Sequence, residues 1–263
     1  MTTYAIPNCP RRDYDAIRAI NQSRLKSFKR SAAHFRYEST SPRKPPGKPM
    51  ILGSLTEHMT LGTEFEYEAM RYPDFRTKES QAWRDDLAAR GIPIVDEETA
   101  DKARAMAARV MALPEFESWK PWRTNIALVG VHEPTGLAMK GLVDAAPDNH
   151  LVVLDLKTTA DASEWGFGKS ICDFGYDVQA YWYQSLWRQA YTEDRQFAFI
   201  CVESEAPFEP SIQVITQEDI DRAGRAVDKW MAQYKACLAT DIWPGYPGGL
   251  TYAKLPAWHF KDV

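Results

Sequence analysis

The sequence has few cysteines and no long apolar run, and both absences restrict the class of protein. Its four cysteines (Cys9, Cys172, Cys201 and Cys237) are scattered over 263 residues and form no Cys-x-x-Cys pair. This spacing favours reduced thiols over a disulfide framework or a zinc site. No apolar stretch approaches the ~18 residues that a membrane-spanning helix needs. The first residues also lack the apolar core of a signal peptide, so we expect a cytoplasmic protein.

The net charge of −4 conceals an uneven distribution along the chain. Residues 1–50 contain eleven Lys or Arg against three acids, which gives this segment +8 and leaves −12 for the remainder. A basic segment on an acidic body is typical of a surface that faces phosphate groups. The alternative is a solvated helix face followed by a basic loop, and charge alone does not separate the two.

The apolar residues make up 44% of the chain, and their spacing predicts mostly helices in the first half. Residues 23–38 are expected to form one amphipathic helix that ends in a Pro-rich basic loop at 39–49. The inward residues of this helix would be Leu25, Phe28, Ala32 and Phe35. Further helices are predicted from about Pro49 through MILGSLTEHMTLG, at 79–91 with Gly91 closing the helix, and at 96–113.

The second half alternates strands with helices. Strands are predicted at 125–133, 137–146, 151–159 and 196–204, and helices at 176–191 and 216–239. This order indicates one α/β or α+β domain over residues 1–263, with a helical N-terminal elaboration. Within it we expect a basic segment at 1–50, a catalytic core at 51–240 and a tail at 241–263.

The stretch GLVDAAPDNHLVVLDLKTT, residues 141–159, holds charged residues in two apolar runs. If Asn149 and His150 form the turn, Asp144 lies opposite Asp155 in an antiparallel pair. Lys157 then shares a face with both, because residues i and i+2 of a strand point the same way. A four-residue loop with the same centre keeps this register, whereas a one-residue slip would move Asp144 to the other face.

Two facing carboxylates repel one another unless a cation lies between them. A hard divalent ion such as Mg²⁺, or alternatively Mn²⁺, suits these oxygen ligands. The lysine would then lie next to the metal, where it could activate water or offset phosphate charge. The alternative is an Asp–Lys ion pair on a solvated strand face, with Asp144 simply ending its strand.

Four segments in the same order resemble a known family. GLVD followed by DLK looks like the core of the PD-(D/E)XK nuclease superfamily. YDVQAYWYQ is similar to the Gln-x-x-x-Tyr helix of its lambda-exonuclease and RecE (exonuclease VIII) branch, a phage-type recombination group. NQSRLKSFKRSAAHFRYE and LGSLTEHMTLG resemble the two preceding helices of RecE-like proteins. The resemblance implies a restriction-endonuclease-like core, a central mixed sheet flanked by helices.

The resemblance assigns roles to individual residues. Asp144 and Asp155 match the metal carboxylates, Lys157 the catalytic lysine, and the Leu156 carbonyl a further metal ligand. Gln179 and Tyr183, at i and i+4, match the Gln-x-x-x-Tyr pair and would share a helix face at the site. The remaining ligand is Glu57 or His58, and adjacent helix residues diverge by about 100°, so we expect one of them. Glu57 is preferred, because its spacing matches and an anion suits a hard metal.

The implied activity is Mg²⁺-dependent hydrolysis of DNA. The RecE and lambda-exonuclease likeness implies 5′→3′ digestion of linear duplex ends, a ring-shaped homo-oligomer (trimer or tetramer) and a single-strand annealing partner. DNA phosphates would be held by Arg24, Lys26, Lys29, Arg30 and Ser31. Alternatives are an endonuclease with the same core chemistry and a catalytically inactive DNA-binding or assembly protein. An iron–sulfur nuclease is disfavoured, because it needs clustered C-terminal cysteines.

Overall fold

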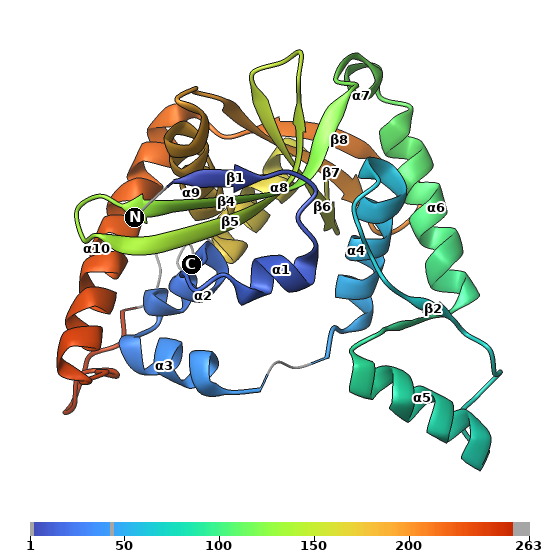
Figure 1. Cartoon of the computed structure of the whole chain (residues 1–263), viewed down its shortest axis with the longest axis horizontal. Coiled ribbons are helices and arrows are strands. Elements are labelled where there is room, and N and C mark those ends of the chain that lie inside the picture. The colour runs from blue at the N-terminus through green and yellow to red at the C-terminus, as the bar shows by residue number, and fades with distance from the viewer. Residues whose placement is uncertain (1–2, 43–44, 255–263) are drawn as a thin grey trace, which may run out of the picture.

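A six-stranded mixed sheet forms the centre of the molecule (Figure 1). The computed structural model describes residues 3–42 and 45–254. The strand order is β1-β4-β5-β6-β7-β8, and β6 pairs parallel to β7 while the other neighbours are antiparallel. The strands are β1 (Tyr4–Ile6), β4 (Trp122–His132), β5 (Leu137–Pro147), β6 (Val152–Thr159), β7 (Gln196–Glu203) and β8 (Pro210–Val214). The predicted mixed sheet is confirmed.

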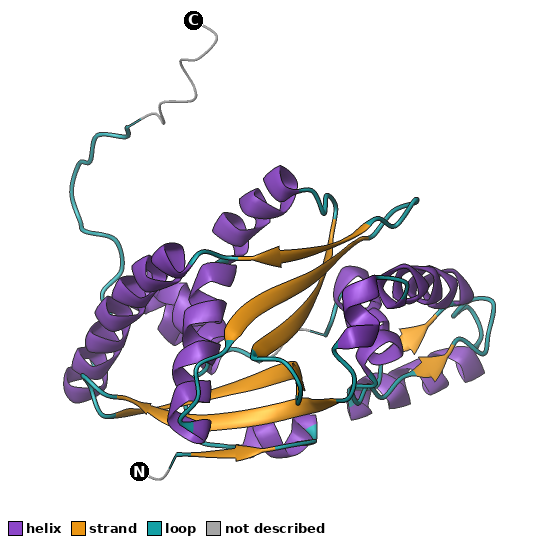
Figure 2. Ribbon diagram, turned by 90° about the horizontal axis from the view of Figure 1, so that it is seen from above, coloured by secondary structure: helices purple, strands orange, loops and turns teal. Residues whose placement is uncertain are grey.

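Helices cover both faces of this sheet (Figure 2). The helices α8 (Glu164–Phe174), α9 (Tyr176–Tyr191) and α10 (Gln217–Thr240) bury one face around Trp182, Phe197 and Phe199. The other face packs against α4 (Lys48–Leu61) and α6 (Glu97–Met111), with Leu154 and Leu156 of β6 in the contact. Because β6 is buried on both faces, its apolar residues form a nearly continuous run, as expected for a strand with a parallel neighbour.

The predicted single helix at 23–38 is wrong. The segment forms α2 (Gln22–Leu25), a 3₁₀ turn (Lys26–Lys29) and α3 (Ala32–Thr40). Ser31 interrupts the helix with extended backbone, φ −175° and ψ 165°, and its hydroxyl accepts a hydrogen bond from the His34 N–H at the start of α3. Serine is a preferred residue at this position, so the break has a local cause. The four apolar residues expected to point inward are all buried.

The N-terminal segment is fixed to the sheet by Lys140 of β5. This lysine is 6% exposed and donates to three backbone carbonyls in and just after α1 (Arg11–Ala16), at distances of 2.8 to 3.3 Å. Ile20 follows and bonds to β5, accepting from the Lys140 N–H and donating to the Ala138 carbonyl. These contacts place residues 11–20 along β5, so α1 lies close to the strand that carries Asp144.

The other elements surround this core. The helix α5 (Lys78–Arg90) ends at Gly91 with φ 72°, as predicted, and projects from the main body beside the parallel pair β2 (Glu68–Ala69) and β3 (Ile94–Val95) (Figure 1). A short helix, α7 (Pro114–Ser118), precedes β4. The basic loop predicted at 39–49 begins after Thr40, and its residues Arg43 and Lys44 lie outside the described residues, as does the end of the predicted tail, 255–263. In the described parts of the chain, no helix is long and apolar enough to cross a membrane.

Candidate active site

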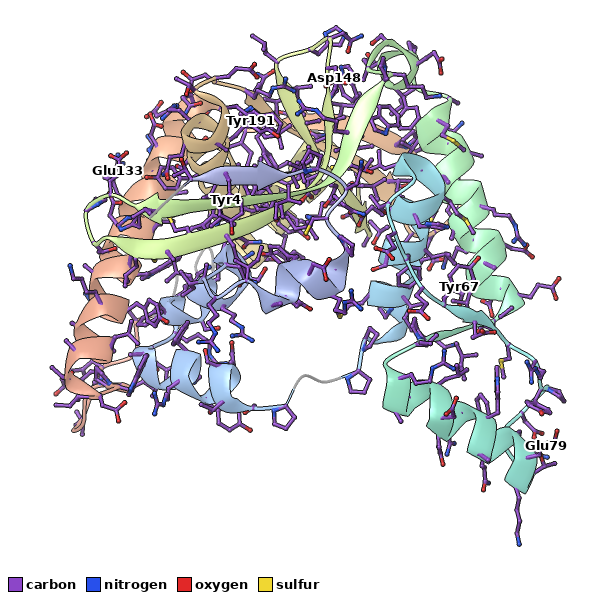
Figure 3. The ribbon with its side chains drawn as sticks, viewed as in Figure 1. Tyr4, Tyr67, Glu79, Glu133, Asp148 and Tyr191 are labelled. Carbon is purple, nitrogen blue, oxygen red and sulfur yellow. The ribbon has the colours of Figure 1, made fainter. Side chains whose placement is uncertain are left out.

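The β5–β6 hairpin has the predicted register. Ala145 pairs with Leu154, and the same register places Asp144 opposite Asp155. The connecting loop has four residues, 148–151, with the same centre as the predicted two-residue turn. Asp148 lies on this loop (Figure 3), where Arg123 donates to its carboxylate at 2.9 Å.

The two strands stop pairing where the acids lie. Ala145–Leu154 is the single ladder pair between β5 and β6 within the described residues, although β4–β5 and β6–β7 pair over most of their lengths. Asp144 spans the opening, and its Oδ2 accepts a hydrogen bond from the Leu156 N–H at 3.0 Å. The side chain thereby satisfies a backbone donor that the ladder would otherwise use. The candidate site is this opening in the sheet.

Asp155 is the buried centre of the cluster, at 1% exposure. Gln179 of α9 donates from Nε2 to its Oδ1, and the Lys157 ammonium pairs with its Oδ2. This Oδ2 is buried and has no hydrogen-bond partner of good geometry. A buried carboxylate oxygen in that state is costly and suited to an added cation.

Tyr183 lies one helical turn beyond Gln179 and packs on β5. A Cβ atom added at Gly141 would lie 2.7 Å from the Tyr183 ring, so this position requires glycine. Burial, followed by Tyr14 and the two aspartates, raises the pKa of the Tyr183 hydroxyl well above its ordinary value. Tyr183 is therefore a neutral, packed neighbour that holds α9 close to the hairpin.

Glu57 and His58 of α4 have different surroundings. The Glu57 carboxylate interacts electrostatically with Asp144, Asp155 and Lys157. His58 instead places Nδ1 at 2.5 Å from the Thr63 carbonyl oxygen and its ring edge toward Tyr67. The structure thus brings Glu57 to the acid cluster and turns His58 to the end of its own helix.

The cluster carries an excess of negative charge. Burial, then the charges of Glu57 and Asp155, raise the pKa of Asp144 well above its ordinary value. Burial, then Asp155, also raise the pKa of Glu57. For Lys157, burial lowers the pKa, but Asp155 and Asp144 more than offset this, so the net shift is upward and the ammonium is charged at neutral pH. One lysine facing three carboxylates leaves room for a further positive charge.

The donor atoms suit a hard divalent cation. Asp144 and Asp155 offer carboxylate oxygens at the opening, and Leu156, whose N–H bonds to Asp144, offers a carbonyl oxygen on β6. Mg²⁺ and Mn²⁺ prefer oxygen ligands. In residues 3–42 and 45–254, no three His, Cys, Asp or Glu side chains are arranged as a ready metal cage. A small cage of two carboxylates and a carbonyl, completed by water or phosphate, is the usual mode of Mg²⁺ binding. Glu57, which interacts electrostatically with both aspartates, is a further candidate ligand.

The predicted DNA-binding residues have different surroundings. Arg24, Lys29 and Arg30 are exposed, whereas the Ser31 hydroxyl is engaged in its own helix, 2.6 Å from His34 Nδ1. Lys26 interacts electrostatically with Lys157 and Asp155 and donates to the Phe174 carbonyl at 2.8 Å. Burial, then the nearby Lys157 ammonium, lower the pKa of Lys26 to about 8.

Two neighbours of the cluster were not predicted from the sequence. The Lys157 Nζ lies 5.0 Å from the centre of the Tyr176 ring, a cation–π distance. Tyr176 precedes Gln179 by three residues, so helical spacing could have found it. Arg11 of α1 is an electrostatic neighbour of Glu57 that partly offsets the rise of its pKa caused by burial and Asp155, and no sequence pattern marks it.

Comparison with known proteins agrees with this architecture. Residues 21–256 match the family described as PDDEXK-like domain of unknown function (DUF3799). The chain belongs to this family. The predicted likeness to the PD-(D/E)XK superfamily is thereby confirmed. The assignment of its acid, acid and lysine to Asp144, Asp155 and Lys157 of the hairpin stays a prediction.

Solved structures support the fold. A crystal structure from Eubacterium rectale, of a protein with a provisional exonuclease assignment, has a TM-score of 0.65 at 14% identity, and the match covers 92% of each chain. The structure of SSO0001 matches 75% of this PDDEXK-like chain and 97% of its own at 12% identity, but its TM-score of 0.29 is too low to support an argument. No curated protein matches the sequence significantly.

Proposed function

We propose that this protein is a metal-dependent DNA exonuclease that degrades one strand of linear duplex DNA in the 5′→3′ direction. The observation that carries the proposal is the opening between β5 and β6, where Asp144, Asp155 and Lys157 meet. Facing carboxylates beside a charged lysine suit phosphodiester hydrolysis, because the reaction develops negative charge on phosphate. The exonuclease mode of attack rests on the sequence resemblance to RecE and lambda exonuclease and on the name of the Eubacterium rectale neighbour. The 5′→3′ polarity rests on the sequence resemblance alone.

The residues divide the chemistry among them. Asp144, Asp155 and the Leu156 carbonyl, with Glu57 as a further candidate, would hold one or two Mg²⁺ ions. Bound metal supplies Lewis-acid polarisation of the phosphate and stabilises the leaving 3′-oxygen. The charged Lys157 orients the attacking water and offsets charge on the phosphate. Gln179 fixes the orientation of Asp155 through the hydrogen bond to Oδ1.

The substrate and partners follow from the same resemblance. Arg24, Lys26, Lys29 and Arg30 would contact DNA phosphates near the duplex end, and Lys26 is the nearest of them to Lys157. We propose a homo-oligomeric ring and cooperation with a single-strand annealing protein in recombination.

A nuclease assay with two forms of DNA tests the activity. Purified protein, Mg²⁺, linear 5′-phosphorylated duplex and covalently closed circles are combined, and the linear DNA carries a label at either the 5′ or the 3′ end. We expect loss of linear DNA alone, early release of the 5′ label, and no activity in EDTA. Asp155→Asn and Lys157→Ala should abolish cleavage, whereas Asp148→Asn, on the loop of the same hairpin, should not.

Each alternative has its own result. Cutting of closed circles would indicate an endonuclease, and early release of the 3′ label would reverse the polarity. Duplex binding without cleavage at any Mg²⁺ or Mn²⁺ concentration would favour the catalytically inactive DNA-binding protein. Undiminished cleavage by Asp155→Asn would reject the assignment of the site.

A further inference from the structure

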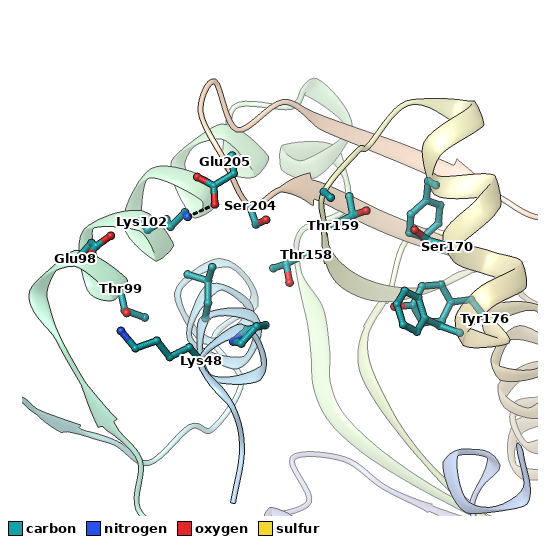
Figure 4. Close-up of a pocket in the computed structure, with 15 residues that line it drawn as sticks. Lys48, Glu98, Thr99, Lys102, Thr158, Thr159, Ser170, Tyr176, Ser204 and Glu205 are labelled. Carbon is teal, nitrogen blue, oxygen red and sulfur yellow. Dashed lines mark hydrogen bonds and ion pairs between the residues drawn. The ribbon is translucent and has the colours of Figure 1, made fainter. Parts of the chain in front are cut away.

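A cavity of about 470 Å³ lies beside the carboxyl end of β6 (Figure 4). Thr158 and Thr159, which follow Lys157 directly, form part of its wall. The helices α4, α6 and α8, the start of α9 and the residues after β7 supply the rest. Thr159 shares the strand face of Lys157 at a distance of about 6.6 Å along the strand, at about 3.3 Å per residue. The volume is within the range of about 300–1,000 Å³ that is usual for small-ligand sites.

Tyr176 belongs to both the cavity and the catalytic cluster. Its side chain lines the cavity, and the centre of its ring is 5.0 Å from Lys157 Nζ. A group that filled the cavity would therefore be a neighbour of the phosphate on which Lys157 acts. The cavity is placed to hold another part of the same substrate.

The charges of the lining do not favour a phosphate. Its lysines are Lys48 and Lys102, and its acids are Glu98 and Glu205, so the formal charge of the wall is zero. Both lysines are already paired, Lys102 with Glu205 at 2.6 Å and Lys48 with Asp96 at 3.3 Å. A dianionic ligand would meet Glu98 and Glu205 in the same wall with no excess of positive charge, whereas a neutral ligand needs none.

The shape and polarity of the walls suit a flat, neutral ring. Tyr176 and Ser170 line one side, and Thr99 and Lys102 lie across the cavity from them (Figure 4). Aromatic rings offer stacking surface, and hydroxyl groups can donate to or accept from the edge of a heterocycle. A nucleobase combines these two properties.

Phe174 provides an accessible stacking surface at the mouth of the cavity. The side chain is 60% exposed and lines the cavity, and its ring centre lies 5.6 Å from that of Tyr176. Its backbone is held in place because the carbonyl accepts from Lys26 Nζ. Phe174 and Tyr176 thus place two adjacent aromatic rings at the cavity, one of them largely open to solvent.

We propose that this cavity receives an unpaired base of the DNA substrate, stacked on Phe174, next to the phosphate that is cleaved. The inference rests on the proposed nuclease function and adds to it that the duplex end is opened at the site. The base belongs to the DNA chain and is not a free nucleotide.

A comparison of base-bearing and abasic substrates tests this. Duplexes carry a tetrahydrofuran abasic residue at one of the first three positions of the 5′ strand, and kcat/KM is measured for wild type, Phe174→Ala and Phe174→Tyr. Trp165→Ala is the control, because Trp165 is on the same helix and 86% exposed but does not line the cavity. On intact DNA we expect Phe174→Ala to lose about 5- to 150-fold, which is a stacking contribution of about 1–3 kcal/mol at 1.4 kcal/mol per factor of ten.

The abasic substrates decide the result. At one of the three positions, the abasic residue should reduce the kcat/KM of the wild-type protein. On that substrate, Phe174→Ala should have the same kcat/KM as wild type. Phe174→Tyr and Trp165→Ala should behave as wild type on every substrate. An equal loss on every abasic substrate, no loss at all, or the same loss for Trp165→Ala would overturn the inference. Competition by deoxyadenosine monophosphate that depends on Phe174, without any abasic effect, would also overturn it, since the cavity would then bind free product.

A binding measurement separates this inference from the proposed function. Fluorescence anisotropy with Ca²⁺ compares the same duplexes and variants without cleavage. If the wild-type protein does not cut DNA but shows the Phe174-dependent preference for a base, the nuclease proposal fails and the base site stands. If it cuts DNA without that preference, the base site is rejected and the nuclease proposal stands.

Discussion

Replacing Asp144 with asparagine should stabilise the folded protein while it abolishes activity. Asp144 is a carboxylate whose pKa is raised by burial and then by the charges of Glu57 and Asp155. Asparagine has the same shape and can still accept the hydrogen bond from the Leu156 N–H, which is 3.0 Å long. The substitution therefore removes the charge and keeps the local structure.

The expected gain is the balance of two effects. The hydrogen bond to Leu156 becomes neutral, and this costs about 1 kcal/mol, the difference between charged and neutral acceptors. Against this, each unit by which the folded pKa exceeds the unfolded one corresponds to about 1.4 kcal/mol of destabilisation at a pH above both. Since the pKa of Asp144 is raised well above its ordinary value, relief of this cost should dominate. We expect a net increase of about 0.5–2 kcal/mol in the free energy of unfolding at pH 8.

The gain should depend on pH in one direction. A raised folded pKa means that the folded protein keeps the Asp144 proton over a range in which the unfolded chain has lost it. The wild-type protein loses stability as the pH rises from the ordinary carboxyl value of 3.8 through the raised folded value. The advantage of Asp144→Asn should therefore grow with pH over this window and vanish below it.

Urea unfolding followed by circular dichroism measures the effect. Wild type, Asp144→Asn and Asp148→Asn are compared in EDTA at pH 5, 6.5 and 8, with unchanged m-values as a check on two-state behaviour. The control should differ from wild type by less than about 0.5 kcal/mol at each pH, because Asp148 lies in an exposed loop. If Asp144→Asn loses more than about 1 kcal/mol at pH 8, or if its effect does not vary with pH, the description of a repulsive acid cluster is wrong.

Three further substitutions test other contacts. Lys140→Met removes the donor that three backbone carbonyls around α1 share, and should lower the free energy of urea unfolding by about 2–4 kcal/mol. Gln179→Leu removes the donor to Asp155 Oδ1, and should lower kcat by about 10- to 100-fold with little change in KM in the nuclease assay. Lys26→Met should weaken duplex binding at pH 7 and have little effect at pH 9.5. The pKa of Lys26 is lowered to about 8, so at pH 9.5 the wild-type protein has also lost the positive charge of this side chain. Fluorescence anisotropy measures the last difference.

Each of these three substitutions has a control variant or an outcome that would contradict the prediction. Lys229→Met, at an exposed position of α10, should leave the free energy of unfolding unchanged. If Lys229→Met lowers it as much as Lys140→Met does, the loss cannot be attributed to the three hydrogen bonds of Lys140. Gln184→Leu is matched to Gln179→Leu, since Gln184 is on the same helix but donates to the Arg195 carbonyl, and its kcat should remain that of wild type. A deficit of Lys26→Met that is as large at pH 9.5 as at pH 7 would show that charge is not its cause.

The hairpin could be predicted from the sequence because its information is local. The turn residues, the alternation of the strands and the position of the acids all lie within residues 141–159, and they suffice to place Asp144 opposite Asp155. The helix α9 was also predicted at its observed bounds, since its sequence forms a helix without interruption. The roles of Glu57, Gln179 and Tyr183 stay predictions, although their positions around Asp155 agree with them.

The remaining features depend on longer-range packing. The helix break at Ser31 was missed because the inward positions Leu25, Phe28, Ala32 and Phe35 keep helical spacing across it. The helix α8 was missed because it contains Gly166 and Gly168, which lower helix propensity. Close packing against Asp161 explains why position 166 is glycine, since a Cβ at Gly166 would clash with the Asp161 side chain. The opening between β5 and β6 was not predicted, because the antiparallel register of residues 141–159 alone does not show that, in the described part of the chain, the two strands share the single ladder pair Ala145–Leu154.

The docking of β1 imposes an order on folding during synthesis. Tyr4 pairs with Val129, which is 125 residues later in the chain, and Lys140 bonds to the end of α1 from later still. At about 5–20 residues per second, the ribosome needs about 6–25 s to make this partner strand after β1. During that time the N-terminal segment has no sheet to join. The first part of the protein to be made therefore waits until about half of the chain exists before its partner strand is available. The strand that carries Asp144 receives the segment 11–20 no earlier than that.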